Sequence, residues 1–452
     1  MIFWILIAIV VLAPLPFASV YPWSWSLMAV SVGGLLIAWS AQVALGKRRP
    51  AFGLQSTWPF VLLFLTPVIW AALQSMSLTP EEWHHPIWRN VSEVLGIKLA
   101  GSVSIDPVVT VSSLMQLLTY GGIFWLSLHY GADPVRARQV FLTLSVAGLA
   151  YAAYGLVVEF SGTKTILWFD KFAYKNDLTS TFVNRNSYAT YAGLTLLCAS
   201  GLLLNLIFKS LAIENRREQV RQLIESMSGR GWFLLIICIT VATALVLSHS
   251  RGGFLSTGLG LIALVMAISL TRTVKTRYSV YIGVLTVFAG VAFFAFSGDV
   301  LDKRLAATSI EAEERPKVYE LTVDAIKASP VLGTGYGSFA KVFSLYRQDN
   351  IRDFYLKAHN TYLENALELG IPAALALFGT FVCMLILTFR GLRRRQRSAI
   401  YPCMGFAATV LVAAHSMVDF SLQIPAVAAT YALIMGVACA QSWGSKRQRG
   451  AW

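Results

Sequence analysis

The sequence predicts an all-α, polytopic membrane protein with about twelve transmembrane helices. Hydrophobic residues make up 56% of the 452 residues and charged residues only 13%, about half of the share found in soluble domains. The mean hydropathy of +0.61 agrees with this composition. A soluble chain this apolar could not cover its surface with polar groups, so we exclude soluble enzymes, coiled coils and disordered proteins.

The apolar residues are grouped into runs of the right length to cross a bilayer, whose core of about 30 Å requires about 20 helical residues. Such runs occur near residues 2–19, 24–45, 58–76, 110–131, 140–159, 188–208, 232–250, 254–271, 278–297, 371–389, 399–418 and 421–442. The first run has no basic segment before it and a second run follows at once, so we expect a retained span rather than a signal peptide. Residues 1–452 are therefore expected to form a single integral membrane domain.

Charge predicts the orientation of these spans. With both termini in the cytoplasm, the inner loops hold 21 of the 37 basic residues and four of the 23 acidic residues, which leaves 16 basic and 19 acidic residues outside. Basic loops remain in the cytoplasm, so we predict that both the N- and C-termini are cytoplasmic. The formal net charge of +14 is then explained by membrane orientation, and we expect no nucleic-acid partner.

Three predicted outer loops are too long to be simple turns: 77–109, 160–187 and 298–370. The last and largest lies between spans nine and ten and contains two amphipathic helical patterns, Arg315–Ser329 and Thr361–Leu369. In the second pattern Glu364 and Glu368 lie opposite the apolar side, which predicts a helix at the membrane interface. Long outer loops that are neither disordered nor repetitive are where function is expected.

Two arginines lie at the predicted outer membrane boundary. Arg251 lies in Ser250-Arg251-Gly252-Gly253, at the tight hairpin between spans seven and eight, and Arg185 lies in Asn184-Arg185-Asn186, where span six begins. A charge at this depth usually faces a cavity or a partner, and polar neighbours at a helix N-terminus suit an anion. The alternative readings are an arginine that reaches to lipid headgroups and an ordinary solvated loop arginine.

His359 lies at the end of the largest outer loop, in Lys357-Ala358-His359-Asn360-Thr361-Tyr362. A histidine accepts a proton near neutral pH with little tuning, although a lone histidine is more often structural. Together with two arginines, it would form a transferase site with two cations for a phosphate-bearing leaving group and one base for an acceptor hydroxyl.

Other polar groups give weaker signals. We interpret the glycine-rich segment 333–337 as a turn, because no alternating strand and helix surrounds it. The pair His84-His85 could bind a metal but fits an exposed polar loop better. His415 and Asp419 are four residues apart on span eleven, where they could support a site or hold the helix bundle together.

The ordered motifs resemble those of the bacterial O-antigen ligase and polymerase superfamily. They are Asn184-Arg185-Asn186, Ser250-Arg251-Gly252-Gly253, Arg315-Pro316, Pro330-x-x-Gly333-x-Gly335-x-Gly337-x-Phe339, His359-Asn360-x-Tyr362-Leu363 and Glu368-x-Gly370. The resemblance implies an inverting glycosyltransferase of lipopolysaccharide biosynthesis that uses neither metal nor other cofactor. It would work at the periplasmic face of the bacterial inner membrane.

The resemblance also implies substrates and residue roles. The donor would be a glycan on undecaprenyl diphosphate, and the acceptor lipid A-core or, for a polymerase, a second lipid-linked glycan. By position, Arg185 and Arg251 match the diphosphate-binding arginines of the family, and His359 matches its base. The neighbouring motif residues are expected to contact substrate: Asn184, Asn186, Ser250, Arg315, Asn360 and Tyr362.

Two other functions remain open at this point. A polysaccharide polymerase would share every motif with a ligase. A twelve-span transporter or flippase of lipid-linked sugars would share the substrate and the surrounding membrane lipids, and the basic inner loop 209–230 resembles the central loop of two-halved transporters. Against a transporter, the arginines lie at the outer boundary and not at the midplane, and the largest loop is outside.

Overall fold

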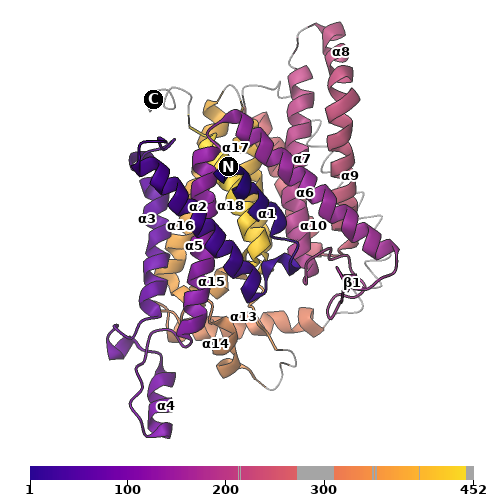
Figure 1. Cartoon of the computed structure of the whole chain (residues 1–452). Coiled ribbons are helices and arrows are strands. Elements are labelled where there is room, and N and C mark those ends of the chain that lie inside the picture. The colour runs from indigo at the N-terminus through magenta and orange to yellow at the C-terminus, as the bar shows by residue number, and fades with distance from the viewer. Residues whose placement is uncertain are drawn as a thin grey trace.

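The computed structural model describes residues 1–211, 213, 215–271, 310–348, 351, 354–395 and 398–443, and it is almost entirely helical (Figure 1). Within these residues the only sheet is a two-stranded antiparallel hairpin, β1 (Thr165–Ile166) with β2 (Phe169–Asp170). The predicted all-α fold class is confirmed.

Eight helices of the described chain are long and apolar enough to cross a membrane. They are α2 (Pro22–Ala44), α3 (Leu54–Gln74), α5 (Pro107–Tyr130), α6 (Pro134–Phe160), α7 (Arg185–Leu211), the continuous segment Arg216–Leu247, α10 (Arg251–Ser269) and α16 (Ile371–Arg394). Three apolar helices are shorter: α1 (Ile2–Leu12), α17 (Ile400–Ser416) and α18 (Pro425–Ala440). These helices coincide with eleven of the predicted runs. The remaining run, 278–297, lies outside the described residues.

Some boundaries differ from the prediction for identifiable reasons. α1 ends at Leu12, short of the predicted residue 19, because Pro14 and Pro16 follow and lack the amide hydrogen that a helix needs; a 3-10 turn (Phe17–Ser19) comes next. The basic segment predicted as a loop at 209–230 is largely helical. There α8 (Arg216–Ser226) continues through a π turn (Met227–Gly231) into α9 (Trp232–Leu247), and α8 projects beyond the bundle (Figure 1).

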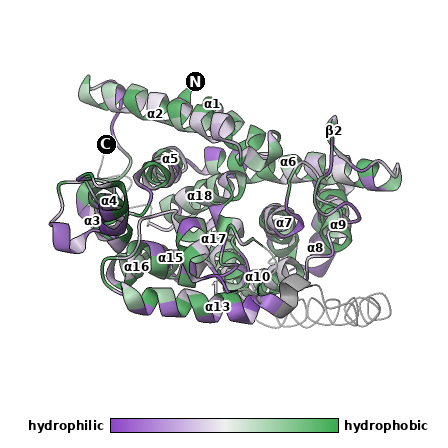
Figure 2. Cartoon of the chain, turned by 90° about the horizontal axis from the view of Figure 1, so that it is seen from below, coloured by the Kyte–Doolittle hydropathy of each residue, from purple (hydrophilic) through white to green (hydrophobic). Residues whose placement is uncertain are grey.

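The last two helices occupy the centre of the bundle. Seen along the bundle, α17 and α18 are surrounded by α5, α7, α10, α15 and α16 (Figure 2). Every residue of α18 is buried, and most of them are small or aliphatic. Small residues let helices approach closely in a membrane, so the C-terminal hairpin is the part around which the other helices pack.

Three helices of the largest predicted outer loop gather at one end of the bundle, at the bottom of Figure 1. They are α13 (Ile310–Ala328), α14 (Phe339–Tyr346) and α15 (Thr361–Leu369). The end of α3 holds this layer in place, because the amide of Gln74 donates to the carbonyls of Leu332 at 2.7 Å and Glu368 at 2.9 Å. α13 begins before the predicted start at Arg315, whereas the predicted bounds of α15 are confirmed. The predicted loop limits themselves stay a prediction.

The environment of α15 differs from the prediction. We expected Glu364 and Glu368 on an exposed side of an interfacial helix, but their side chains are buried. Glu364 pairs with Lys357 at 3.0 Å, and Glu368 accepts a hydrogen bond from the main-chain N–H of Phe339 at 3.0 Å. Burial and the nearby Glu364 charge raise the pKa of Glu368 to about 8, so the neutral acid is favoured in the fold. Polar partners within the loop layer therefore cover the side that sequence periodicity assigned to solvent.

The segment 333–337 is a turn, as predicted. Gly333, Gly335 and Gly337 all have positive φ, at 69°, 106° and 86°. A side chain at Gly333 would also collide with the main chain of Glu368, so this turn requires glycine both for conformation and for close approach to α15.

Candidate functional site

The three principal sequence motifs meet at the short loop between α17 and α18, where the central residue is Asp419. Its side chain is 1% exposed. One carboxylate oxygen, Oδ2, accepts a hydrogen bond from Asn186 Nδ2 at 2.7 Å and lies 3.6 Å from His359 Nδ1. The other oxygen, Oδ1, accepts from the N–H of Phe420 and the hydroxyl of Ser421. Asp419 therefore joins the start of α7 to the loop before α15.

The N-terminal ends of α7 and α10 are held together by their own capping residues. Asn184 caps α7, because its Oδ1 accepts from the N–H of Asn186 at 2.7 Å, and Ser250 caps α10 by accepting from the N–H of Gly253 at 3.2 Å. The two caps are linked, since Ser250 Oγ donates to Asn186 Oδ1 at 2.8 Å. Arg185 and Arg251 are the chain neighbours of this hydrogen-bonded pair, so the structure brings both arginine motifs to one place.

Close packing of these two helix ends requires a glycine. A Cβ atom at Gly253 would lie 2.4 Å from the Cβ of Ala189 on α7, which is far inside van der Waals contact. The Ser-Arg-Gly-Gly motif therefore has a structural component in addition to its charge.

Arg185 is held by an acidic residue that the sequence analysis did not select. Its Nη1 lies 2.9 Å from Asp177 Oδ2, while Asp177 Oδ1 lies 2.8 Å from His249 Nδ1. The guanidinium also lies over the ring of Tyr174, at 5.3 Å. Burial alone would raise the pKa of Asp177, but the hydrogen bond from His249 and the charge of Arg185 outweigh it and lower the pKa. The carboxylate of Asp177 therefore holds the guanidinium of Arg185 in a fixed orientation.

Arg251 differs from Arg185 in its surroundings. Its side chain is exposed, and no hydrogen bond or ion pair joins it to another residue in the described part of the chain. It occupies the first position of α10, where main-chain N–H groups add positive potential. An exposed guanidinium at a helix start is available to an anionic ligand.

His359 is fixed in position and conformation. It has a φ of 52° and is 8% exposed, and its ring lies 4.9 Å from the ring of Phe420 in an edge-on arrangement. Tyr319 on α13 donates to its carbonyl at 2.9 Å. Because Nδ1 faces Asp419, the other ring nitrogen, Nε2, is the one that can receive a proton from a substrate.

The carboxylate of Asp419 is ionised at physiological pH. Burial would raise its pKa, but the close approach of the His359 ring, the neighbouring His415 and the N–H of Phe420 lower the pKa to about 2. A buried carboxylate beside a histidine stabilises the protonated ring and fixes its orientation. The pair therefore has the arrangement of a base with its supporting carboxylate.

Four of the predicted substrate-binding residues instead hold main-chain segments in the structure. Asn360 Oδ1 caps α15, and its amide donates to the carbonyl of Met417 at 3.1 Å. Tyr362 donates to the carbonyl of Ala413 at 2.9 Å, and Arg315 donates to the carbonyl of Val418 at 3.2 Å. Asn184 acts as the cap of α7. These bonds position the α17–α18 loop, while the proposed substrate contacts stay a prediction.

The other three histidines that the sequence analysis considered also have structural partners. His415 Nδ1 lies 2.7 Å from Thr190 Oγ1, under Gly252. His84 Nε2 lies 2.9 Å from the carbonyl of Thr79, and His85 accepts from the N–H of Ile87 to cap α4 (Pro86–Leu95). Within the described residues, no group of three or more His, Cys, Asp or Glu side chains could hold a metal ion.

Comparison with known proteins agrees with the motifs. Residues 236–378 match the family model described as O-antigen ligase. The match includes Arg251, Arg315 and His359, whereas Arg185 and Asp419 lie outside it. No curated protein matches the chain. Through residues 236–378 the chain is similar to the O-antigen ligase family, and this similarity supports the resemblance of its motifs to the O-antigen ligase and polymerase superfamily.

Proposed function

We propose that the protein transfers a glycan from undecaprenyl diphosphate to an acceptor hydroxyl at the periplasmic face of the inner membrane, with lipid A-core as the acceptor. The observation that carries this proposal is the convergence of His359, Asn186 and, through Ser250, both arginine motifs on the buried carboxylate of Asp419. This arrangement supports the assignment of His359 as a base, with Arg185 and Arg251 at the starts of α7 and α10.

In the proposed reaction, His359 Nε2 removes the proton of the acceptor hydroxyl as its oxygen attacks the anomeric carbon. The bond between this carbon and the phosphate oxygen breaks, and undecaprenyl diphosphate leaves with the bonding electrons. Attack from the side opposite to the leaving group inverts the anomeric configuration. Asp419 stabilises the positive charge that the imidazole ring gains.

Arg185 and Arg251 stabilise the charge that grows on the leaving diphosphate, which is the largest contribution in many enzyme sites. Arg185 is oriented by Asp177, while Arg251 is exposed at the start of α10. Since cleavage of the bond between the glycan and the diphosphate already supplies the driving force, the reaction requires no nucleotide, and the arginines take the place of a metal ion at the phosphates.

Transfer by the purified protein tests this function. The protein would be mixed with a lipid-linked donor and lipid A-core, and the covalent product would be measured without any gradient. We expect His359→Ala, Arg185→Ala and Arg251→Ala to abolish transfer while remaining folded in detergent. His84→Ala and Arg89→Ala are matched controls, because both residues lie in the predicted outer loop 77–109, away from Asp419. Near-normal transfer by His359→Ala would contradict the assignment of the base.

The same assay separates the competing functions. A polymerase would join the glycan to a second lipid-linked repeat unit rather than to lipid A-core. A transporter or flippase would form no covalent product with either acceptor.

A further inference from the structure

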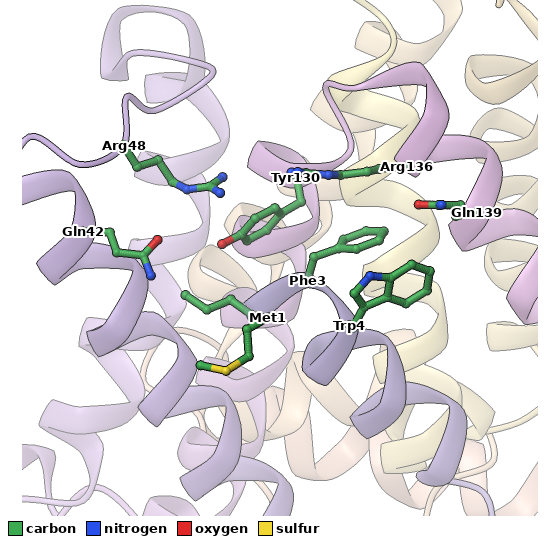
Figure 3. Close-up of a pocket in the computed structure, with 9 residues that line it drawn as sticks. Met1, Phe3, Trp4, Gln42, Arg48, Tyr130, Arg136 and Gln139 are labelled. Carbon is green, nitrogen blue, oxygen red and sulfur yellow. The ribbon is translucent and has the colours of Figure 1, made fainter.

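A second cationic site lies at the end of the bundle opposite to Asp419. α5 begins beside the 333–337 turn, where Ile105 bonds to Thr334, and it ends at Tyr130. Around Tyr130 there is a cavity of about 220 Å³ (Figure 3). Its walls come from α1, the end of α2, the segment after α2, the end of α5 and the start of α6, so it is built from parts far apart in the sequence.

Two guanidinium groups converge on one aromatic ring in this cavity. Arg48 lies 4.5 Å and Arg136 5.4 Å from the centre of the Tyr130 ring, and Arg136 also lies 5.5 Å from the ring of Phe3. Figure 3 shows the two charged ends pointing toward each other above the rings. The nearest carboxylate oxygen described for either arginine is that of Asp133, 3.7 Å from Arg136 and half exposed to solvent. The cavity therefore carries an excess of positive charge.

Arg48 and Arg136 are less exposed than the other basic residues of their two segments, 47–49 and 136–138. Lys47, Arg49 and Arg138 are exposed, as expected for basic residues that only fix orientation. Arg48 and Arg136, one from each segment, are half-buried and turned inward. Orientation in the membrane requires positive charge in these segments but does not require that two charges approach each other, so a ligand is the better explanation.

The remaining lining fits the headgroup and tail of a lipid. Gln42 and Gln139 also line the cavity and supply amide donors for ester and glycerol oxygens. Below them, Trp4 is 53% exposed, and Ile5 and Leu12 continue an exposed apolar strip along α1. Guanidinium groups bind phosphate in the manner that a membrane-surface lipid site needs.

We propose that this cavity binds the phosphate of an anionic phospholipid of the cytoplasmic leaflet, with Arg48 and Arg136 as the phosphate ligands and the apolar strip of α1 against an acyl chain. The site is separate from the transfer reaction and does not depend on the proposed function. Free phosphate is also an anion, but it has no apolar part that could pack against the exposed apolar strip of α1. We therefore favour the lipid.

Native mass spectrometry of the purified protein, titrated with phosphatidylglycerol or phosphatidylcholine, tests the proposal. We expect wild-type protein to bind phosphatidylglycerol at least about fivefold more tightly than phosphatidylcholine. The double variant Arg48→Gln/Arg136→Gln should lose about 25-fold in phosphatidylglycerol affinity, at about fivefold for each arginine. Arg49→Gln/Arg138→Gln removes the same charge from the same two segments and should change the affinity less than about threefold.

Several results would overturn the proposal. If wild-type protein bound phosphatidylglycerol and phosphatidylcholine equally, the proposal would be wrong. This comparison uses no variant, so a folding defect in Arg48→Gln/Arg136→Gln does not affect it. An equal loss in the two double variants would show that the effect is general surface charge. Displacement of phosphatidylglycerol by millimolar inorganic phosphate would show that the cavity binds a soluble anion rather than a lipid.

Discussion

Asp419→Asn is the most informative single change in the candidate site. The substitution keeps the size of the side chain but removes its charge, and it places an amide opposite the donor groups of Asn186 and His359. The distance of 3.6 Å between Asp419 Oδ2 and His359 Nδ1 corresponds to an attraction of about 4.6 kcal/mol at an effective dielectric constant of about 20. This attraction arises only once the ring has accepted a proton, so it lowers the barrier for base catalysis.

The full attraction corresponds to a factor of about 2,000 in rate, and a half-completed proton transfer would retain only part of it. Because the orientation of the ring is also lost, we expect transfer to fall by about 100-fold to 1,000-fold, within the range for general base catalysis. Turnover would be measured with saturating lipid-linked donor and acceptor, and KM for the donor should change little, because the arginines are retained.

Ser421→Ala is the matched control for this change. Ser421 also bonds to Asp419, but to Oδ1, where the N–H of Phe420 remains as a second donor at 2.8 Å. We expect its turnover to stay within about threefold of wild type. Turnover of Asp419→Asn within the same threefold, or an equal loss in Ser421→Ala, would refute the view that the carboxylate acts through the histidine.

Four other changes test the catalytic and structural roles of single residues. Arg251→Ala should abolish transfer without lowering the unfolding temperature in detergent. Arg185→Ala should abolish transfer and also lower the unfolding temperature, because the buried carboxylate of Asp177 loses one of its two partners; equal unfolding temperatures would contradict this distinction. Gly253→Ala brings a methyl group against Ala189 and should destabilise the protein by about 1–3 kcal/mol, and an unchanged unfolding temperature would mean that α10 can shift freely. Glu368→Gln mimics the neutral acid that the fold favours. Since the wild-type protein loses stability as the pH rises from about 4.5 toward 8, the variant should unfold at a higher temperature than wild type at about pH 9 and at the same temperature at about pH 5, and the reverse pattern would contradict the raised pKa.

Much of the fold could be predicted because a bilayer imposes length and hydropathy on every span. The bounds of α15 followed from its amphipathic periodicity, and the structure adds that Asn360 caps the helix. The end of α1 was missed because hydropathy alone does not register that Pro14 and Pro16 interrupt the helix. The burial of Glu364 and Glu368 was also missed, because periodicity separates the two sides of a helix but does not reveal what covers each side.

The site was predictable in part, for a similar reason. Arg185, Arg251 and His359 stood out as charged or titratable groups in short motifs. Asp177 and His249 did not, since each is unremarkable in its own segment and acts only through a contact across 72 residues. His249 directly precedes the Ser-Arg-Gly-Gly motif, which is the signal that could have drawn attention to it. The sequence left His415 and Asp419 undecided, and only the fold shows that Asp419 is the one that reaches His359.

The position of Asp419 also has a consequence for biogenesis. Asp419 follows its partner Asn186 by 233 residues and lies between the last two helices, which themselves fill the centre of the bundle. A ribosome must therefore complete α17 and α18, and both must insert, before His359 gains its carboxylate. A partly synthesised chain already carries Arg185, Arg251 and His359 but not the carboxylate that His359 faces, so the candidate site is completed only when the last two helices pack into the centre of the bundle.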